Sequence, residues 1–231
     1  MIENQPVLTI HRGHRRPERA LIEAFRGSQT SHLVDAMEGR GAVDWRIKPL
    51  DPANAGFVGA ALTCHSYPAD FCGVGGAVME AEAGDVIMCC NEYYTGTAVI
   101  GDLAAGAMRN KGVAAFVTDG LARDRAGIVA SGLPVFAMGI VPNSPASIGP
   151  GQVGAAIVLG GVPVASGDIV VGDADGVVVI PLAQAEAVLA RLRKVQAAEK
   201  SAEEAVKGGA TSLPSWHEIV RHARKIGRAH V

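Results

Sequence analysis

The segment from residue 101 to residue 124, GDLAAGAMRNKGVAAFVTDGLARD, decides the fold. Its spacing predicts a helix that opens with Asp102 and ends at Lys111-Gly112, since glycine commonly closes helices. A strand over 113–118 follows, and Arg123-Asp124 comes just after it. In open α/β sheets, ligands bind at helix N-termini and at the carboxyl ends of strands. The segment therefore predicts an α/β fold in which two carboxylates and one guanidinium meet, where a small anion and a divalent metal can bind together.

The helix after Gly101 carries Leu103, Ala107 and Met108, which we expect to face the protein interior. A second helix is expected over 125–131, closed by Gly132, so Asp124 stands at its start. Taken alone, an Arg-Asp pair at such a place is typical of a surface ion pair or a helix cap. Asp102 at a neighbouring helix start favours a binding site instead.

Strand–helix alternation continues upstream of this segment, and Val-rich strands cluster downstream. Upstream, the pattern predicts helices over 17–25 and after the possible caps at 28–31, and strands over 56–64 and 84–90. Downstream, it predicts a hairpin of 169–171 with 177–180 around Asp175-Gly176. A long helix over 182–207 and a short helix over 216–226 are expected to follow. Clustered strands after an alternating region predict two packed sheet layers with helices outside. We divide the chain into an N-terminal arm and helix (1–27), an α/β core (28–181) and a C-terminal helical extension (182–231).

Composition is that of an ordinary globular protein: 231 residues, 48% hydrophobic and 19% charged, with a formal net charge of −2. This balance gives no reason to expect binding to nucleic acid or to a membrane. No apolar run approaches the ~20 residues that cross a bilayer, and Met1–Gln5 lacks the apolar segment of a secretory signal. The four cysteines form no Cys-x-x-Cys pair, so we expect reduced thiols and a cytoplasmic protein.

Two further motifs have alternative interpretations. Gly73-Val74-Gly75-Gly76 is expected to be a loop before a short helix over 77–83, and its backbone N–H groups could bind an anion. Asp173-Ala174-Asp175-Gly176 is similar to the start of a calcium loop, but the acidic residue that ends such loops is missing. A hairpin turn explains its spacing better.

Several ordered motifs run through residues 28–207: Ser31-x-x-x-Asp35-Ala36, Gly84-Asp85-Val86, Gly101-Asp102-Leu103, Val117-Thr118-Asp119-Gly120-x-x-Arg123-Asp124, Gly132-x-Pro134-Val135-Phe136-Ala137, Gly167-Asp168-Ile169-Val170-x-Gly172-Asp173-x-Asp175-Gly176-Val177 and Ile180-Pro181. With them the chain resembles the RraA-like family. This family comprises the class II 4-hydroxy-4-methyl-2-oxoglutarate/4-carboxy-4-hydroxy-2-oxoadipate aldolases and the regulator of ribonuclease activity A. The resemblance implies an α/β/β/α sandwich of the swivelling-domain type, here with a long C-terminal helix. It also implies a homotrimer or homohexamer with active sites between subunits.

The resemblance also implies roles for particular residues. Asp124 would hold the metal, and Arg123 would contact the pyruvyl oxygen of the substrate. Asp102 and the backbone amide of Leu103, next to Gly101, would position metal-bound water and the substrate carboxylate. An acid from the long C-terminal helix of the adjacent subunit would complete the site, for which we choose Glu199 over Glu203.

From these roles we expect a lyase: a metal-dependent aldolase, using Mg²⁺ or Mn²⁺, that cleaves a 4-hydroxy-2-oxo acid to pyruvate. Oxaloacetate decarboxylation is an expected side activity. The lysines all lie in polar or terminal contexts, which disfavours the alternative Schiff-base route. The alternative function is a non-catalytic regulator that binds a ribonuclease or another protein partner, because fold alone does not settle function.

The sequence departs from the family pattern at one position. Aldolases of this family usually carry an acidic residue three positions after the Asp of Arg-Asp, and here Gly127 occupies that place. We expect weaker metal binding or a different substrate preference as a result, and we expect Gly127→Glu to raise metal affinity or turnover.

Overall fold

The computed structural model describes residues 6–223, and strand β3 (Phe57–Ser66) is the centre of its main sheet. The strand order is β1 (Leu8–Ile10), β9 (Gly151–Val153), β3, β4 (Asp85–Cys90), β6 (Ala115–Thr118), β8 (Val135–Ala137) and β2 (Lys48–Pro49). Strands β3, β4, β6 and β8 are parallel, with Ala60 opposite Asp85 and Val86 opposite Ala115. Their carboxyl ends therefore lie at one edge of the sheet, where the sequence places its charged motifs.

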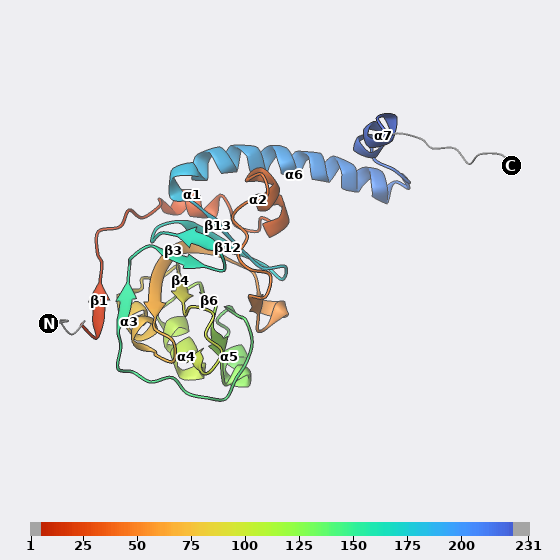
Figure 1. Cartoon of the computed structure of the whole chain (residues 1–231). Coiled ribbons are helices and arrows are strands. Elements are labelled where there is room, and N and C mark those ends of the chain that lie inside the picture. The colour runs from red at the N-terminus through yellow and green to blue at the C-terminus, as the bar shows by residue number, and fades with distance from the viewer. Residues whose placement is uncertain (1–5, 224–231) are drawn as a thin grey trace.

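One face of this sheet is covered by α3 (Cys72–Glu80), α4 (Asp102–Asn110) and α5 (Arg125–Ser131), which lie together in Figure 1. The core between them is apolar and includes Ile87, Met108, Phe116 and Ile128. Fully burying such a side chain contributes about 1.5–3 kcal/mol. The packing of α4 and α5 on the sheet thus fixes where their first turns lie.

The opposite face of the sheet packs against further strands. These are the hairpins β10 (Ile157–Leu159) with β11 (Val162–Val164), and β12 (Ile169–Gly172) with β13 (Val177–Ile180). The second hairpin continues the main sheet, because β12 also pairs antiparallel with β3, with Val170 opposite Gly59. Side chains along β12 and β13 alternate between two cores, because successive residues of a strand point to opposite faces. Val170 and Val179 meet Met88 of the main sheet, whereas Ile169 and Ile180 face the outer helices.

The outer layer contains α1 (Arg19–Glu23), α2 (Thr30–Ala36) and the long α6 (Ala185–Lys207), which follows a short 3₁₀ turn over Leu182–Gln184. Phe25, Leu33, Val188 and Leu192 are buried against β12 and β13. The first half of α6 therefore rests on the body, while its second half projects with α7 (Pro214–Arg221) at its far end (Figure 1). Helix, sheet, strands and helix form the four layers of the expected α/β/β/α sandwich. Within residues 6–223, no helix combines the length and apolar character needed to cross a membrane.

The Asp173 motif stabilises the junction between two of these layers. Asp173 lies at the tip of the β12–β13 hairpin and accepts hydrogen bonds from the backbone N–H of Thr30 and from its hydroxyl, both at 2.8 Å. Asp173 thus accepts from a backbone N–H in the first turn of α2, a helix whose N-cap residue, Gln29, makes no side-chain capping hydrogen bond. The interpretation of 173–176 as a hairpin turn is confirmed, since Asp173 and Gly176 exchange backbone hydrogen bonds.

The prediction of a glycine loop at 73–76 is wrong, because all four residues lie inside α3. Close packing explains these glycines: a Cβ on Gly73 would lie 2.2 Å from the carbonyl oxygen of His65, and one on Gly76 would lie 2.7 Å from Leu8. Glycine here lets a helix lie directly on a strand. The N–H of Val74 donates to the hydroxyl of Ser66 at 3.1 Å, and that of Gly75 donates to the carbonyl of Phe71 at 2.9 Å, so these two donors are already used within the fold.

The other expected elements differ mainly at their ends. Helix α1 is shorter than 17–25, and α7 begins at Pro214 rather than at Trp216; residues 224–226 of the expected helix lie outside the described part. The four cysteines, Cys64, Cys72, Cys89 and Cys90, are all free thiols, as expected. Cys64 and Cys89 are buried in the core beneath α3 and α4, where burial raises the pKa of the Cys64 thiol.

Candidate functional site

Two short parallel strands bring the charged motifs together. Strand β5 (Ala98–Ile100) leads into α4, and β7 (Leu121–Ala122) leads into α5. The N–H of Arg123 donates to the carbonyl of Ile100 at 3.0 Å, which extends this pairing to the start of both helices. Asp102, Arg123 and Asp124 are thereby brought to one place, as the sequence predicts.

Asp124 occupies a strained backbone position. It precedes α5 with φ 56° and ψ 42°, in the left-handed region, and its side chain makes no capping hydrogen bond to the helix. Such a conformation costs about 1–3 kcal/mol for a residue other than glycine, and it is concentrated at functional sites. Its Oδ2 lies 3.2 Å from the Nε of Arg123, and 43% of the side chain is exposed. Of the two structural alternatives, the helix cap is therefore wrong for the side chain of Asp124, whereas the partly exposed ion pair with Arg123 is present.

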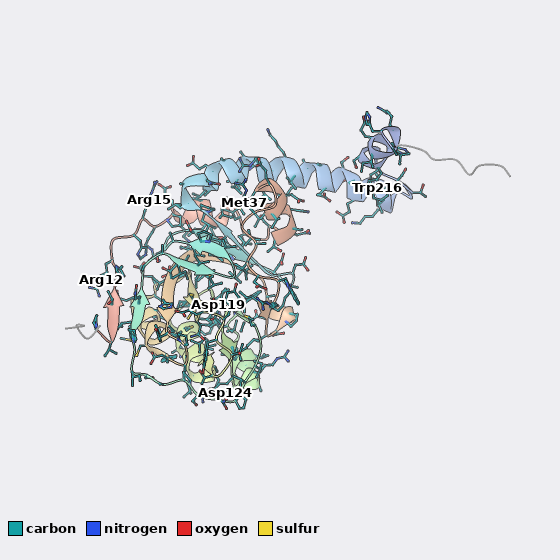
Figure 2. The ribbon with its side chains drawn as sticks, in the orientation of Figure 1. Arg12, Arg15, Met37, Asp119, Asp124 and Trp216 are labelled. Atoms are coloured by element: carbon teal, nitrogen blue, oxygen red, sulfur yellow. The ribbon has the colours of Figure 1, made fainter. Side chains whose placement is uncertain are left out.

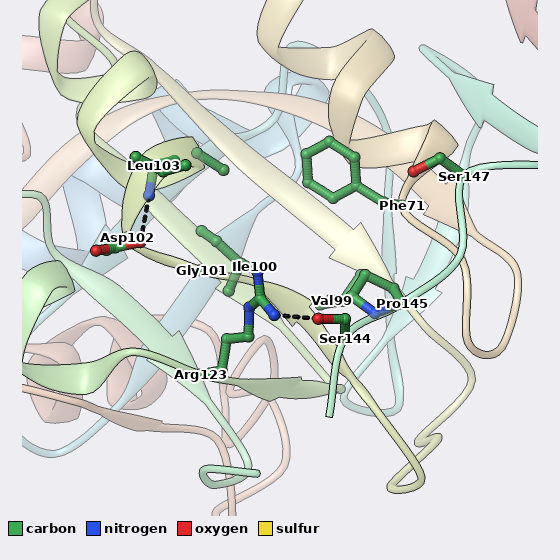
Figure 3. Close-up of a pocket in the computed structure, with 11 residues that line it drawn as sticks. Phe71, Val99, Ile100, Gly101, Asp102, Leu103, Arg123, Ser144, Pro145 and Ser147 are labelled. Carbon is green, nitrogen blue, oxygen red and sulfur yellow. Dashed lines mark hydrogen bonds between the residues drawn. The ribbon is translucent and has the colours of Figure 1, made fainter. Parts of the chain in front are cut away.

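Arg123 is held from two sides. Besides Asp124, it meets Ser144, whose hydroxyl accepts a hydrogen bond from the Nη1 of Arg123 (Figure 3). Ser144 belongs to the proline-containing segment after β8, with Pro142 and Pro145 on either side of it. Sequence reasoning missed this contact, since nothing in the local pattern relates residue 144 to residue 123.

Asp102 is the first residue of α4 and accepts a hydrogen bond from the N–H of Leu103 at 2.8 Å. The expectation that Leu103 and Ala107 face inward is wrong, because both are exposed, Leu103 by 86%. The buried side chains of α4 are Ala105 and Met108. Residues 103 and 107 share one helical face, and that face is turned away from the sheet.

A cavity of about 320 Å³ opens beside these residues. Its charged and hydroxyl-bearing walls come from α4, Arg123 and the segment after β8, and its apolar wall comes from Phe71, Val99 and Pro145 (Figure 3). The residues that line it are Phe71, Val99, Ile100, Gly101, Asp102, Leu103, Ala104, Arg123, Ser144, Pro145 and Ser147. A small anionic molecule with a short apolar portion matches this lining.

Two glycines allow the charged groups to approach one another. A Cβ on Gly101 would lie 2.8 Å from the Oδ2 of Asp124 and 3.1 Å from the Nε of Arg123. A Cβ on Gly127 would lie 2.6 Å from both the Cβ and the Oδ2 of Asp102. Gly127 is therefore more than a missing carboxylate, because any side chain there competes with Asp102 for space.

The donor set suits a hard divalent cation but is incomplete in one chain. Asp124 lies against Gly101, which precedes α4, and Asp102 lies against Gly127 in the first turn of α5, so the two carboxylates are at neighbouring helix starts. Among residues 6–223, no group of three or more His, Cys, Asp or Glu side chains forms a metal site. Mg²⁺ commonly binds one or two carboxylates and keeps several waters, so two aspartates fit such an ion if water, substrate or another subunit supplies the rest.

Glu199 and Glu203 do not reach this cavity within the same chain. Both are exposed on α6, which lies on the opposite side of the molecule from α4 and α5 (Figure 1), and Asp124 is at the far end of the body from α6 (Figure 2). Glu203 pairs with Lys207 at 2.5 Å. A contribution from either glutamate therefore requires a second subunit, as the family resemblance implies.

Asp119, the acid that precedes Arg123 in the same motif, has a structural position. It is buried, and its Oδ1 accepts a hydrogen bond from the N–H of Asn91 at 2.5 Å. Burial raises the pKa of its carboxyl. The side chain of Asn91 donates in turn to the carbonyls of Ser66 and Tyr67. This network joins the carboxyl ends of β3, β4 and β6 and supports the strands from which the site projects.

The fold and the site together define a class: an α/β/β/α sandwich protein with a charged cavity where two helices begin. The RraA-like family, described as Aldolase/RraA, matches residues 30–179. A protein of Halalkalibacterium halodurans, provisionally named a 4-hydroxy-4-methyl-2-oxoglutarate aldolase, is 35% identical over 201 residues, which are 87% of this chain and 95% of that protein. This chain belongs to the RraA-like family.

Solved structures agree with this assignment. A protein from Pseudomonas syringae pv. tomato superimposes with a TM-score of 0.75 at 26% identity, covering 86% of this chain and 97% of that chain. The RNA-processing inhibitor RraA from a Thermus species superimposes with a TM-score of 0.61 at 25% identity, covering 67% of this chain and 93% of that chain. The fold is thus shared with a family that includes both a provisionally named aldolase and an RNA-processing inhibitor.

Proposed function

We propose that this chain is a divalent-metal-dependent aldolase that cleaves a 4-hydroxy-2-oxo acid, of the 4-hydroxy-4-methyl-2-oxoglutarate kind, to pyruvate. The observation that carries this proposal is the meeting of Asp102, Arg123 and Asp124 at the entrance of two helices, beside one cavity. The provisional name of the Halalkalibacterium halodurans relative supports the same reaction class. Oxaloacetate decarboxylation is the proposed side activity, because it also produces the enolate of pyruvate.

Asp124 would hold the metal, Mg²⁺ or Mn²⁺, with Asp102 contacting its waters. When bound, the ion supplies Lewis-acid polarisation of the 2-oxo group. Asp124 suits this role because its carboxylate is partly exposed, makes no capping bond and is presented by a strained backbone. Both carboxylates are hard oxygen donors of the kind that these ions prefer.

Arg123 binds the oxyanion end of the substrate in this proposal. A guanidinium forms bidentate hydrogen bonds with planar oxyanions and has no proton to lose at neutral pH. Asp124 and Ser144 already fix its orientation, so little reorganisation is needed as negative charge develops on the 2-oxo oxygen. Arg123 therefore stabilises the charge that appears when the C3–C4 bond breaks.

Asp102 is the proposed partner in proton transfer. Acting through an ordered water, and with Glu199 or Glu203 of an adjacent subunit, it would accept the proton of the 4-hydroxyl group. The N–H of Leu103, which now donates to Asp102, becomes available to a substrate carboxylate when Asp102 turns toward that water. This arrangement requires a homotrimer or homohexamer in which α6 of one chain reaches the cavity of the next.

The proposal is tested by measuring pyruvate release from a panel of 4-hydroxy-2-oxo acids and from oxaloacetate, with added Mg²⁺ or Mn²⁺ and with a chelator. We expect release that depends on the metal and disappears with the chelator. Absence of lyase and decarboxylase activity with every divalent metal would overturn the enzymatic proposal.

The second candidate is a non-catalytic regulator that binds a ribonuclease or another protein. The shared fold with the Thermus RNA-processing inhibitor favours it. A regulator needs only the folded assembly and an exposed surface, so its partner binding should tolerate both chelation and Asp124→Ala. An aldolase should lose its activity under either condition.

A further inference from the structure

Residues 144–149, here called the strap, form one wall of the cavity, and buried Asp70 fastens them. Asp70 is 3% exposed, and its Oδ2 accepts hydrogen bonds from the N–H of Ile148 at 2.8 Å and of Gly149 at 2.9 Å. Its Oδ1 accepts from the N–H of Cys72 at 2.7 Å, at the start of α3. One carboxylate therefore ties the strap to a helix that is packed on the sheet.

Backbone hydrogen bonds fasten the same segment a second time. The N–H of Phe71 donates to the carbonyl of Ala146 at 2.9 Å, and the N–H of Ala146 donates to the carbonyl of Ala69 at 2.7 Å. Burial disfavours the charged form of Asp70, but the three N–H donors outweigh it and lower the pKa of this carboxyl. The strap is thus held by a charged acceptor at neutral pH, although most of its side chains are exposed.

The strap ends beside Arg123. Ser144 accepts from the Nη1 of Arg123 (Figure 3). The Nε of the same guanidinium lies 3.2 Å from the Oδ2 of Asp124. Contacts at two different nitrogens fix the plane of a guanidinium. Within residues 6–223, Nη2 makes no hydrogen bond to protein and is available to a ligand in the cavity.

We propose that Ser144 is a positioning residue for Arg123, and that Asp70 acts on the same guanidinium through the strap. Asp70 holds residues 148 and 149, the backbone of Ala69 and Phe71 holds Ala146, and the segment held in this way carries Ser144, which fixes the guanidinium plane. The structural part of this inference concerns only this chain's own residues, whereas its catalytic consequence rests on the proposed function. Since Arg123 would stabilise charge on the reacting oxygen, losing its orientation should lower kcat more than it raises KM.

The direct test observes the guanidinium itself, by ¹⁵N NMR of the arginine side chains, with the Arg123 signals assigned from Arg123→Lys. In Ser144→Ala, we expect faster rotation of the Arg123 Nη groups and faster exchange of their protons. Ser144→Thr keeps the hydroxyl and should restore the wild-type signals. Ser147→Ala is the matched control, because Ser147 lies on the same strap and lines the same cavity without bonding to Arg123. Unchanged Arg123 signals in Ser144→Ala would overturn the positioning role.

The contribution of Asp70 is tested by hydrogen exchange. Asp70→Asn preserves side-chain volume but replaces one acceptor oxygen with an N–H₂ group that faces backbone N–H donors. We expect faster amide exchange at Ile148 and Gly149, together with the same change in the Arg123 signals as in Ser144→Ala. Faster exchange on the strap with unchanged Arg123 signals would limit Asp70 to a structural role and overturn its part of the proposal.

Oxalate, a planar dianion similar to pyruvate enolate, tests the consequence for ligand binding. In the presence of Mg²⁺, Ser144→Ala should bind oxalate about ten-fold more weakly than wild type, the loss typical of one hydrogen bond to a charged group. If Ser144→Ala loosens Arg123 but wild type shows neither lyase nor decarboxylase activity with any divalent metal, the positioning inference stands and the proposed function fails. If wild type releases pyruvate in a metal-dependent way, and Ser144→Ala leaves both the Arg123 signals and oxalate binding unchanged, the inference fails and the proposed function stands.

Discussion

The carboxylate of Asp102 lies in the space that a side chain at Gly127 would occupy, since a Cβ on Gly127 would be 2.6 Å from the Oδ2 of Asp102. The contact joins the first turns of α4 and α5, the two helices at whose starts the charged residues meet. Gly127, which stands where aldolases of the family usually have an acidic residue, therefore provides space for Asp102. Gly127 lets Asp102 adopt its present orientation, so an acidic residue cannot simply be added there.

Gly127→Ala should lower pyruvate release by about 10- to 100-fold, the range typical when support of a metal site is lost, because Asp102 must move. Gly127→Glu should do the same, which reverses the expectation from sequence that it would raise turnover. The matched control is Gly106→Ala in α4, where a Cβ would meet nothing within 4 Å. Steady-state kinetics with metal titration check this, and increased turnover in Gly127→Glu would show that Asp102 relocates without loss.

Gly101→Ala should impair the site while leaving the fold intact. The three nearest atoms to the added Cβ would all belong to two side chains: the Oδ2 of Asp124 at 2.8 Å, and the Nε and Cγ of Arg123 at 3.1 and 3.3 Å. The backbone of Gly101, with φ −132°, is accessible to alanine. We expect an unchanged melting temperature and at least a ten-fold loss of oxalate binding in the presence of Mg²⁺, with Gly106→Ala again as the control. Oxalate binding equal to that of wild type would show that the site does not need the close approach of Asp124 and Arg123 to the backbone of residue 101.

Asp124→Asn should abolish metal-dependent pyruvate release while the fold persists, because it removes a charged oxygen donor. We expect metal affinity to fall by about ten-fold or more. Calorimetric titration with Mn²⁺ and circular dichroism together separate a lost ligand from an unfolded protein. Full activity in metal-saturated assays would leave Asp124 with only a conformational role.

The ion pair of Asp44 with Arg46 predicts a specific pH dependence. The side-chain hydrogen bond from Arg46 lowers the pKa of Asp44 to about 2. Because the folded-state pKa is depressed, the stabilisation is present above the unfolded value of about 3.9 and is lost as the pH falls through 2. A carboxyl ¹³C titration should give a pKa of about 2 for Asp44 in wild type and a higher pKa in Arg46→Ala, where the side-chain hydrogen bond is lost and only the bond from the backbone N–H of residue 46 remains. An equal pKa in both proteins would mean that the pair does not form in solution.

The chain should be an obligate oligomer, a trimer or a hexamer. Val188 and Leu192 bury the first half of α6 on its own body, whereas Glu199 and Glu203 lie exposed on the second half. A helix that projects in this way is suited to reach a neighbouring subunit. Light scattering at micromolar concentration checks the mass, and a monomer would contradict the shared-site proposal.

The sequence by itself determined the order of strands and helices around residues 101–124 and the placement of Asp102, Arg123 and Asp124 at helix starts. It also determined the β12–β13 hairpin and the long α6. These features follow from local signals: hydrophobic periodicity, turn residues and glycines that close helices. Such signals act between residues close together in the chain, so they can be interpreted without knowing the packing.

Only the tertiary structure decided which partners these residues meet. Ser144 bonds to Arg123, 21 residues earlier in the chain, and Asp70 accepts hydrogen bonds from Ile148 and Gly149 on the same strap, 78 and 79 residues later. Gly73 and Gly76 are helical because α3 lies directly on β3 and β1, a close approach that overrides the usual preference of glycine for loops. The exposure of Leu103 and the contact of Asp102 with Gly127 likewise depend on how α4 is turned and packed. Each of these outcomes depends on long-range packing, whose free energy no local pattern encodes.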